Sequence, residues 1–240
     1  MSVDLLRISA KCQLVALILL SSIDAQEFPP ADVVKTIHLF TVPNYCEGVV
    51  FDRDGNGYTS HGKTITKFSI DGEHETWVET GAPNGHKILA DGTHLVCDAS
   101  HHAVLRLSPS GELLDPASIE CNGTKLRGPN DLSLDVVNDG FYFTDPGGRG
   151  IDNLIGTVHY VDKHGKTHLI DDGLAYPNGV VLVPGGKRLL VCESQKNRIL
   201  EYKVTGPGKV GERTIFAKLP AKSEAQGQVD NQPDGICLDA

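Results

Sequence analysis

Four residues that can offer oxygen atoms to a ligand stand at matching places in four short phrases of this chain. They are Glu47 in Cys46-Glu47-Gly48-Val49, Asn130 in Gly128-Pro129-Asn130-Asp131, Asn178 in Tyr176-Pro177-Asn178-Gly179 and Asp234 in Gln232-Pro233-Asp234-Gly235. Carboxylate and amide oxygens suit a hard cation such as calcium, which takes about six to eight oxygen ligands. They do not suit structural zinc, which is bound by thiolate and imidazole. The phrases therefore predict an oxygen-lined cation site, provided that the fold brings them together.

A fifth phrase of the same form, Ala82-Pro83-Asn84-Gly85, lies between the first two. With Asn84 included, the key positions are separated by 37, 46, 48 and 56 residues. Spacing of this size is typical of repeat architectures. We expect Asn84 to face a substrate or to support the structure rather than to bind the cation.

The segments between these five site phrases contain short apolar runs separated by turn sequences. After Glu47 the runs are 48–51, 58–61, 64–70 and 76–79, joined by Asn-Gly and Asp-Gly turns, which are strong hairpin signals. Later repeats show runs at 87–89, 93–98 and 103–107, at 132–134, 141–144 and 156–161, and at 180–183, 188–193 and 198–204. About four strands in each repeat of ~40–50 residues predict an all-β fold, the β-propeller.

In a propeller, residues at the same place in each repeat converge at one end of the central channel. Glu47, Asn130, Asn178 and Asp234 are therefore expected to form a ring in space. Single Asn-Gly and Asp-Gly pairs are common in ordinary turns. The prediction of a metal site consequently depends on their repetition, not on any one phrase.

On these motifs the chain resembles the SMP-30/gluconolactonase family of six-bladed propellers, whose relatives include drug-responsive lactonases and diisopropyl fluorophosphatase. The matching residues are Glu47-Gly48, Pro129-Asn130-Asp131, Gly140–Asp145, Pro177-Asn178-Gly179 and Pro233-Asp234-Gly235, within a resemblance that runs from about Val42 to Ala240. The resemblance implies a six-bladed propeller with the last blades incomplete in this chain. It also implies a divalent metal held by Glu47, Asn130, Asn178 and Asp234, usually calcium, with zinc or magnesium as alternatives.

The same resemblance implies hydrolysis of a lactone or related ester. A calcium ion can polarise a carbonyl, and a carboxylate beside it can act as general base toward water. By family analogy this catalytic base is Asp234. Asp131 adjoins a predicted ligand and is expected to support the site or contact substrate. Arg127, one residue out of register with a substrate-binding arginine of some relatives, is carried over with Asn84 as a substrate-binding residue.

Three functions are compatible with these residues. The first is an exported, calcium-dependent carboxylic ester hydrolase of the gluconolactonase type, which opens a sugar-type lactone such as gluconolactone. The second is a phosphotriesterase or arylesterase on the same metal site, and the third is a non-catalytic binding propeller with a structural metal. Glu47 and Asp234 favour an enzyme, because a pure binding propeller needs no convergent carboxylates. The net charge of −9 argues against a nucleic-acid partner.

Residues 1–25 have the form of a secretory signal peptide, with Arg7 and Lys11 before an apolar run at 14–20 and a cleavage site before Gln26. The run is too short for a spanning helix, and an uncleaved anchor is the alternative. The mature protein is expected in the periplasm or outside the cell, without membrane contact after cleavage. Residues 31–240 are expected to form the propeller domain.

Several further features have ordinary structural interpretations. The run 52–57 resembles the start of an EF-hand loop but lacks its final glutamate, so we interpret it as a blade hairpin. The pair His101-His102 is expected in a solvated loop and Trp77 in blade packing. Cys97, Cys192 and Cys237 lie in strand-like runs and are expected to be small core residues. Residues 33–40 and 236–240 are expected to be strands at the two ends of the domain.

Overall fold

The computed structural model describes residues 33–220 and 232–238. The predicted signal peptide lies outside these residues. The described residues fall into two units, a short one of residues 33–36 and a main unit that begins at Ile37. Residues 33–36 form no strand, and the following description concerns the main unit.

The main unit contains four antiparallel sheets of four strands each, which we call blades 1 to 4. Blade 1 is β1 (Cys46–Phe51), β2 (Gly57–His61), β3 (Thr64–Phe68) and β4 (His74–Glu79), and blade 2 is β5 (Pro83–Ile88), β6 (His94–Asp98), β7 (Ala103–Leu107) and β8 (Leu113–Ser118). Blade 3 is β11 (Leu132–Asp135), β12 (Gly140–Asp145), β13 (Gly156–Val161) and β14 (Thr167–Leu174), and blade 4 is β15 (Pro177–Leu182), β16 (Arg188–Glu193), β17 (Arg198–Gly206) and β18 (Lys209–Lys218). A small hairpin, β9 (Glu120–Cys121) and β10 (Thr124–Lys125), connects blades 2 and 3, and a short 3-10 helix, Ser194–Lys196, follows β16.

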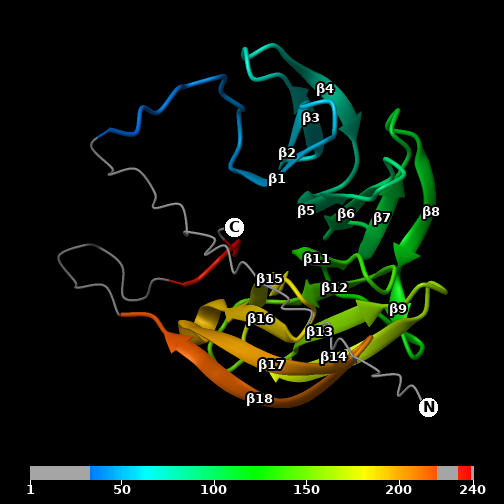
Figure 1. Cartoon of the computed structure of the whole chain (residues 1–240), viewed down its shortest axis with the longest axis vertical. Coiled ribbons are helices and arrows are strands. Elements are labelled where there is room, and N and C mark those ends of the chain that lie inside the picture. The colour runs from blue at the N-terminus through cyan, green and yellow to red at the C-terminus, as the bar shows by residue number, and fades with distance from the viewer. Residues whose placement is uncertain (1–32, 221–231, 239–240) are drawn as a thin grey trace, which may run out of the picture. The chain divides into compact units, whose positions relative to one another are not determined.

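Within each blade the strands pair in chain order, so the first strand is at one edge and the fourth at the other. Figure 1 shows the first strands on the inner side of the curve along which the blades follow one another. The first strand of each blade contacts the first strand of the next, β1 with β5, β5 with β11 and β11 with β15. The predicted all-β propeller is confirmed, whereas a total of six blades stays a prediction.

Turn chemistry fixes the hairpins within the blades. In the β1–β2 turn, the Asp52 carboxylate accepts hydrogen bonds from the backbone N–H groups of Asp54 and Asn56, at 3.0 and 2.9 Å. Gly55 adopts φ +85, a conformation that favours glycine. The segment 52–57 is therefore a blade hairpin, as predicted, and its carboxylate is used to close the turn.

The core lies between the faces of successive blades. Tyr58, Ile65, Val96 and Leu105 pack between blades 1 and 2, with the Trp77 ring 5.1 Å from that of Tyr58. Two similar clusters join blades 2 and 3 and blades 3 and 4. Each fully buried aromatic or aliphatic side chain contributes about 1.5–3 kcal/mol. Packing at these interfaces fixes the position of each blade, and so of its first strand, against the next blade.

The buried cysteines are partly as predicted. Cys97 and Cys192 are buried in β6 and β16, whereas Cys237 is exposed, so its prediction as a core residue is wrong. Residues 33–40 and 232–238 contain no strand, so the terminal strand predictions are wrong for 33–40 and for 236–238, the described part of the second. A strand needs a partner along its length, and the segment 232–238 makes only isolated hydrogen bonds to blade 4, such as Gly179 N–H to Asp234 O at 3.1 Å. Among the described residues no helix has the length and apolar character needed to cross a membrane.

Candidate metal and active site

The site phrases lie where the first strands of the blades begin. Glu47, Asn84 and Asn178 are the second residues of β1, β5 and β15, and Asn130 lies just before β11. Three of the phrases are thus inside strands, not ahead of them as predicted. In β1 the pairing register shifts directly after Glu47, and in β5 and β15 it shifts across Asn84 and Asn178. Such an irregularity re-aims side chains at the end of a strand.

Adjacent phrases contact one another through their backbones. The Gly85 N–H donates to the Asn130 carbonyl at 2.8 Å, and the Gly179 N–H donates to the Asp234 carbonyl at 3.1 Å. Between blades 3 and 4, the Thr144 hydroxyl donates to the Asn178 carbonyl at 2.7 Å.

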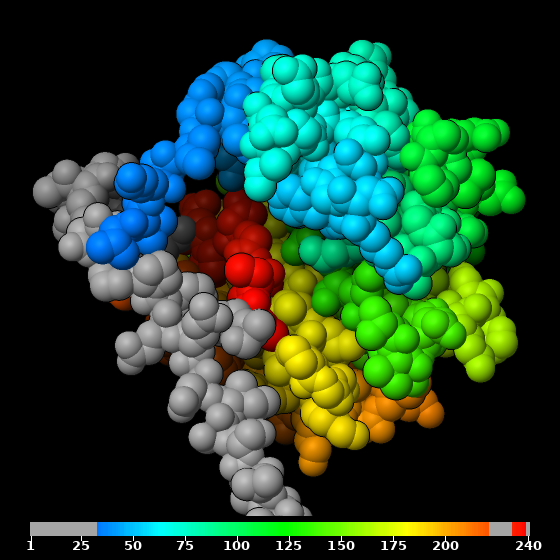
Figure 2. Space-filling view, turned by 45° about the horizontal axis from the view of Figure 1, so that its top comes forward, coloured from blue at the N-terminus to red at the C-terminus, as the bar shows by residue number. Residues whose placement is uncertain are grey.

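Gly48 shows how closely blades 1 and 2 approach. A Cβ atom at Gly48 would lie 2.0 Å from the Asn84 carbonyl oxygen, which leaves room only for glycine. Figure 2 shows the segment 232–238, in red, against the yellow atoms of blade 4. The five phrases are therefore neighbours in the order of their sequence.

The acidic side chains of these phrases influence one another electrostatically. Burial, followed by the negative charge of Asp234, raises the pKa of the Glu47 carboxyl above its ordinary value. A hydrogen bond from the Asn84 side chain and the charge of Arg149 oppose this rise, and the charge of Asp131 adds to it. The charges of Asp234 and Glu47 also raise the pKa of the Tyr45 hydroxyl. Two carboxylates that repel each other next to amide oxygens form a region of negative potential.

The residues present fit a hard cation. The Oδ1 atom of Asn130 is buried and has no hydrogen-bond partner among the described residues. An orphaned oxygen is costly unless a ligand satisfies it, and a cation would also relieve the repulsion between Glu47 and Asp234. The described residues contain no group of three or more His, Cys, Asp or Glu side chains that could hold a metal. The predicted set has only two such residues, because its other members are asparagines.

Asp131 connects blades 3 and 4. Its carboxylate accepts from the backbone N–H of Leu132 at 2.8 Å and from that of Val180 at 3.2 Å. Burial raises the pKa of this carboxyl, and the positive charge of Lys87 opposes the rise. These bonds give Asp131 a supporting position beneath the phrases, while its contact with substrate stays a prediction.

The charge of Arg149 lowers the pKa of the Glu47 carboxyl, whereas Arg127 bonds to its neighbours through its backbone. The Arg127 backbone N–H donates to Asp145 at 2.8 Å, and the Arg127 carbonyl oxygen lies 2.8 Å from the His102 ring nitrogen Nδ1. The guanidinium of Arg149 instead lies 5.0 Å from the centre of the Tyr176 ring, in a cation–π contact. Sequence analysis missed Arg149 because it lies in the β12–β13 connection, outside every repeated phrase.

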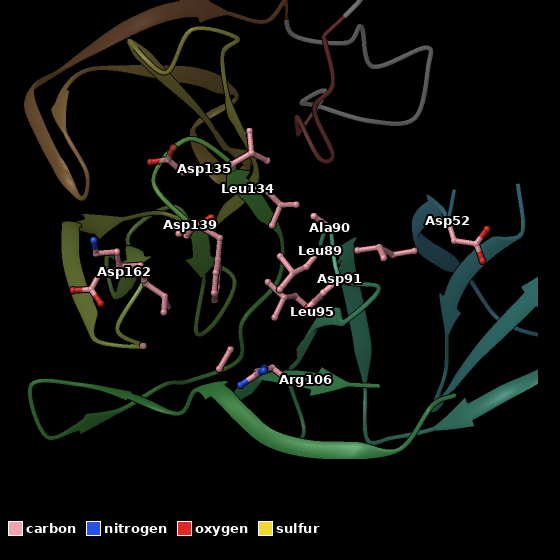
Figure 3. Close-up of a pocket in the computed structure, with 18 of the residues that line it drawn as sticks. Asp52, Leu89, Ala90, Asp91, Leu95, Arg106, Leu134, Asp135, Asp139 and Asp162 are labelled. Carbon is pink, nitrogen blue, oxygen red and sulfur yellow. The ribbon is translucent and has the colours of Figure 1, made fainter. Parts of the chain in front are cut away.

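A cavity of about 720 Å³ lies elsewhere in the described residues. It is lined by the ends of the first strands and the turns that follow them, including Phe51, Ile88 and Leu134 (Figure 3). The phrases stand at the opposite ends of these strands. Of its carboxylates, Asp52 closes a turn, Asp135 accepts from Asn138, and Asp91 accepts from the Thr93 N–H group.

The fold and the converging phrases define a β-propeller with an acidic, oxygen-rich site where its first strands begin. Residues 46–240 match the family model described as the SMP-30/Gluconolactonase/LRE-like region. The chain belongs to this family.

Individual relatives carry different names. Protein strictosidine synthase-like 10 of Arabidopsis thaliana is 33% identical over 151 residues, which are 58% of this chain and 40% of that protein. Gluconolactonase of Zymomonas mobilis is 29% identical over 167 residues, 65% of this chain and 46% of that protein. The chain thus spans less than half the length of these relatives. The solved structure of a gluconolactonase from Xanthomonas campestris has a TM-score of 0.68 at 22% identity and covers 82% of this chain and 67% of that chain, which supports the fold.

Proposed function

We propose that this protein is a calcium-dependent hydrolase that opens a small lactone of the sugar type. The observation that carries the proposal is the backbone contact between neighbouring site phrases, together with the effect of the Asp234 charge on Glu47. The gluconolactonase name of the Zymomonas relative supports the substrate class. Glu47, Asn130, Asn178 and Asp234 would hold the cation.

The chain's own residues supply binding and proton transfer. When bound, calcium would supply Lewis-acid polarisation of the lactone carbonyl. Asp234, an exposed carboxylate beside Glu47, accepts a proton from the water whose oxygen attacks the acyl carbon. The ring C–O bond then breaks, and the departing oxygen takes up a proton to give a hydroxy acid.

Arg149 and Tyr45 are suited to bind the substrate. Both side chains act electrostatically with Glu47, and the stack on Tyr176 holds the Arg149 guanidinium in place. A guanidinium donates several hydrogen bonds to hydroxyl or carboxylate oxygens. Arg149 therefore replaces Arg127 in our proposal as the residue that binds the lactone oxygens and the product carboxylate.

The proposal is tested by lactone hydrolysis, followed as proton release from the purified protein. Activity should disappear after chelation and return with calcium, with magnesium and zinc added separately for comparison. Asp234→Asn should lower kcat by at least a hundredfold while calcium binding is largely kept. Asp139→Asn, which removes an exposed charge in the β11–β12 turn, is the matched control and should leave kcat unchanged. Full activity in Asp234→Asn would refute the assignment of the base.

The alternatives give different outcomes in the same assay. Turnover of phosphotriesters or aryl esters without turnover of lactones would favour the second function on the same site. Calcium binding without any hydrolysis would favour a binding propeller.

We also propose export to the periplasm or the outside of the cell, on the basis of residues 1–25. N-terminal sequencing of the protein recovered from its native compartment tests this, and a chain that begins at Gln26 is expected.

A further inference from the structure

A buried carboxylate ends the second strand of three blades. Asp98 ends β6, Asp145 ends β12 and Glu193 ends β16, and these residues are 0%, 1% and 0% exposed. A buried charge is costly unless it is paired or hydrogen-bonded. The partners of these carboxylates should therefore show why they are present.

In blades 2 and 3 the partners include the two backbone N–H groups just ahead of the proline of the site phrase. Asp98 accepts from Gly81 and Ala82, at 2.9 and 3.0 Å, directly before Pro83-Asn84. It also accepts from the His101 N–H group at 2.9 Å and lies 3.0 Å from the His101 ring nitrogen Nδ1. Two successive N–H groups that converge on one anion form a concave anion site of the backbone.

Blade 3 repeats this arrangement around Asp145. The carboxylate accepts from Arg127 at 2.8 Å and from Gly128 at 2.6 Å, directly before Pro129-Asn130. The proline that follows has a fixed φ and no N–H group. The path from the bonded N–H groups to the Asn130 side chain therefore contains few free torsions.

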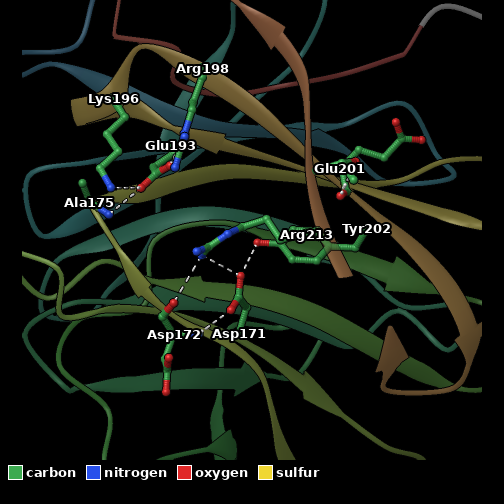
Figure 4. Close-up of polar contacts among 10 residues, drawn as sticks. Asp171, Asp172, Ala175, Glu193, Lys196, Arg198, Glu201, Tyr202 and Arg213 are labelled. Carbon is green, nitrogen blue, oxygen red and sulfur yellow. Dashed lines mark hydrogen bonds and ion pairs between the residues drawn. The ribbon is translucent and has the colours of Figure 1, made fainter. Parts of the chain in front are cut away.

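In blade 4 the same role falls to Glu193, which accepts from the Ala175 N–H at 2.9 Å. Figure 4 shows that Glu193 also meets Lys196 and Arg198. The Arg198 Nε atom lies 2.5 Å from the carboxylate and the Lys196 Nζ atom 3.7 Å from it. The two cations neutralise the charge of Glu193, which accepts from only one backbone N–H group of this segment. That group belongs to Ala175, directly before Tyr176-Pro177-Asn178.

Blade 1 departs from the pattern. Its second strand ends at His61, whose Nε2 atom bonds to Thr66 within the same blade at 2.8 Å. Glu47 is preceded by Cys46 rather than proline. The Glu47 carboxylate instead receives a hydrogen bond from Asn84, and Asn84 is on the segment that Asp98 holds. The Asp98 bonds thus act on Glu47 through blade 2.

We propose that Asp98, Asp145 and Glu193 are positioning residues, which hold the site's oxygen ligands in place through the backbone ahead of each phrase. The inference rests on the proposed function for the identity of the ligand, calcium. It assigns these acids to the site although none of them is a predicted ligand. Each acid bonds to backbone N–H groups that stand two or three residues before the asparagine of a site phrase, although the acid itself is far from that phrase in the sequence.

Asp145→Asn is the primary test, with Asp135→Asn as its control. Asp135 is also buried, at 4% exposed, and ends β11 of the same blade, where it accepts from Asn138 and Tyr160. Both variants should lose stability. Calcium affinity, measured by calorimetry on the folded protein, should fall at least tenfold in Asp145→Asn and stay within twofold in Asp135→Asn. Hydrogen exchange of the amides at 127–131 should accelerate only in Asp145→Asn.

Equal calcium affinities and unchanged exchange at 127–131 in Asp145→Asn would overturn the inference. If the unmodified protein binds no calcium, the proposed function fails, while the exchange comparison still decides the positioning role. If Asp145→Asn does not fold, Glu193→Gln is compared with Glu201→Gln, whose side chain pairs with Arg188 on the same blade. Weaker calcium binding only in Glu193→Gln supports the inference, and equal binding in both overturns it.

Discussion

Replacement of Gly179 by alanine should lower activity strongly while it changes the stability of the fold only slightly. Gly179 follows the predicted ligand Asn178 and donates its N–H to the Asp234 carbonyl at 3.1 Å. A Cβ atom at Gly179 would lie 2.2 Å from that carbonyl oxygen and 2.8 Å from the Ile236 nitrogen. The backbone of Gly179 does not adopt the left-handed region, so the effect of the added methyl group is steric.

The size of the effect follows from the contact distance. Carbon and carbonyl oxygen approach to about 3.3 Å in favourable contacts, so Asp234 must move by about 1 Å. A misplacement of about 1 Å in a catalytic group can cost ~10²-fold in rate. The loss of one hydrogen bond costs only about 1 kcal/mol of unfolding free energy. Gly179→Ala should therefore lose activity about a hundredfold with little change in Tm.

The assay is lactone hydrolysis with saturating calcium, together with thermal unfolding of the same samples. Gly235→Ala is the matched control, because a Cβ atom at Gly235 would meet nothing within 4 Å. This control should keep kcat/KM within about threefold. Gly179→Ala with the turnover of the unmodified protein would refute the view that the contact between the phrases positions Asp234.

Three further predictions concern stability and accessibility. Thr144→Val removes the hydroxyl that donates to the buried Asn178 carbonyl, and denaturant unfolding should show a loss of about 1–3 kcal/mol. Burial lowers the pKa of His159 to about 4; its neutral form is stable in the folded protein, so stability should fall as pH drops from about 6.5 toward 4, by about 2 kcal/mol at pH 5. Unfolding of His159→Gln at pH 7 and pH 5 should show a smaller difference than the unmodified protein, and an equal difference would contradict this cause. A thiol reagent should label the exposed Cys46 in the folded protein and the buried Cys97 only after unfolding, as mapped by mass spectrometry.

Local signals predicted the second and third strands of the blades well. The runs at 103–107, 156–161 and 188–193 coincide with β7, β13 and β16. Their turns are set by residues next to one another in the chain, as at Asp52, where the side chain bonds to the backbone two and four residues on. Outer strands such as β8 and β18 were not predicted, because their pairing partners give them strand structure more than their own composition does. Both terminal strand predictions failed for the same reason.

What the sequence determined by itself is the repeat. Phrases recurring at similar spacing specify equivalent positions, and equivalent positions in a propeller share one end of the axis. That reasoning needed no distances and identified Glu47, Asn130, Asn178 and Asp234 as a set.

Only the tertiary structure decided how the set is supported. Arg149, in the β12–β13 connection, contacts the Tyr176 ring. Asp145, at the end of β12, accepts hydrogen bonds from the N–H groups of Arg127 and Gly128. Such contacts join residues that no local pattern relates, since they depend on blade packing and on the register of strands. The repeated phrases therefore determine which chemical groups the candidate site has, and the contacts between strands and blades determine their geometry.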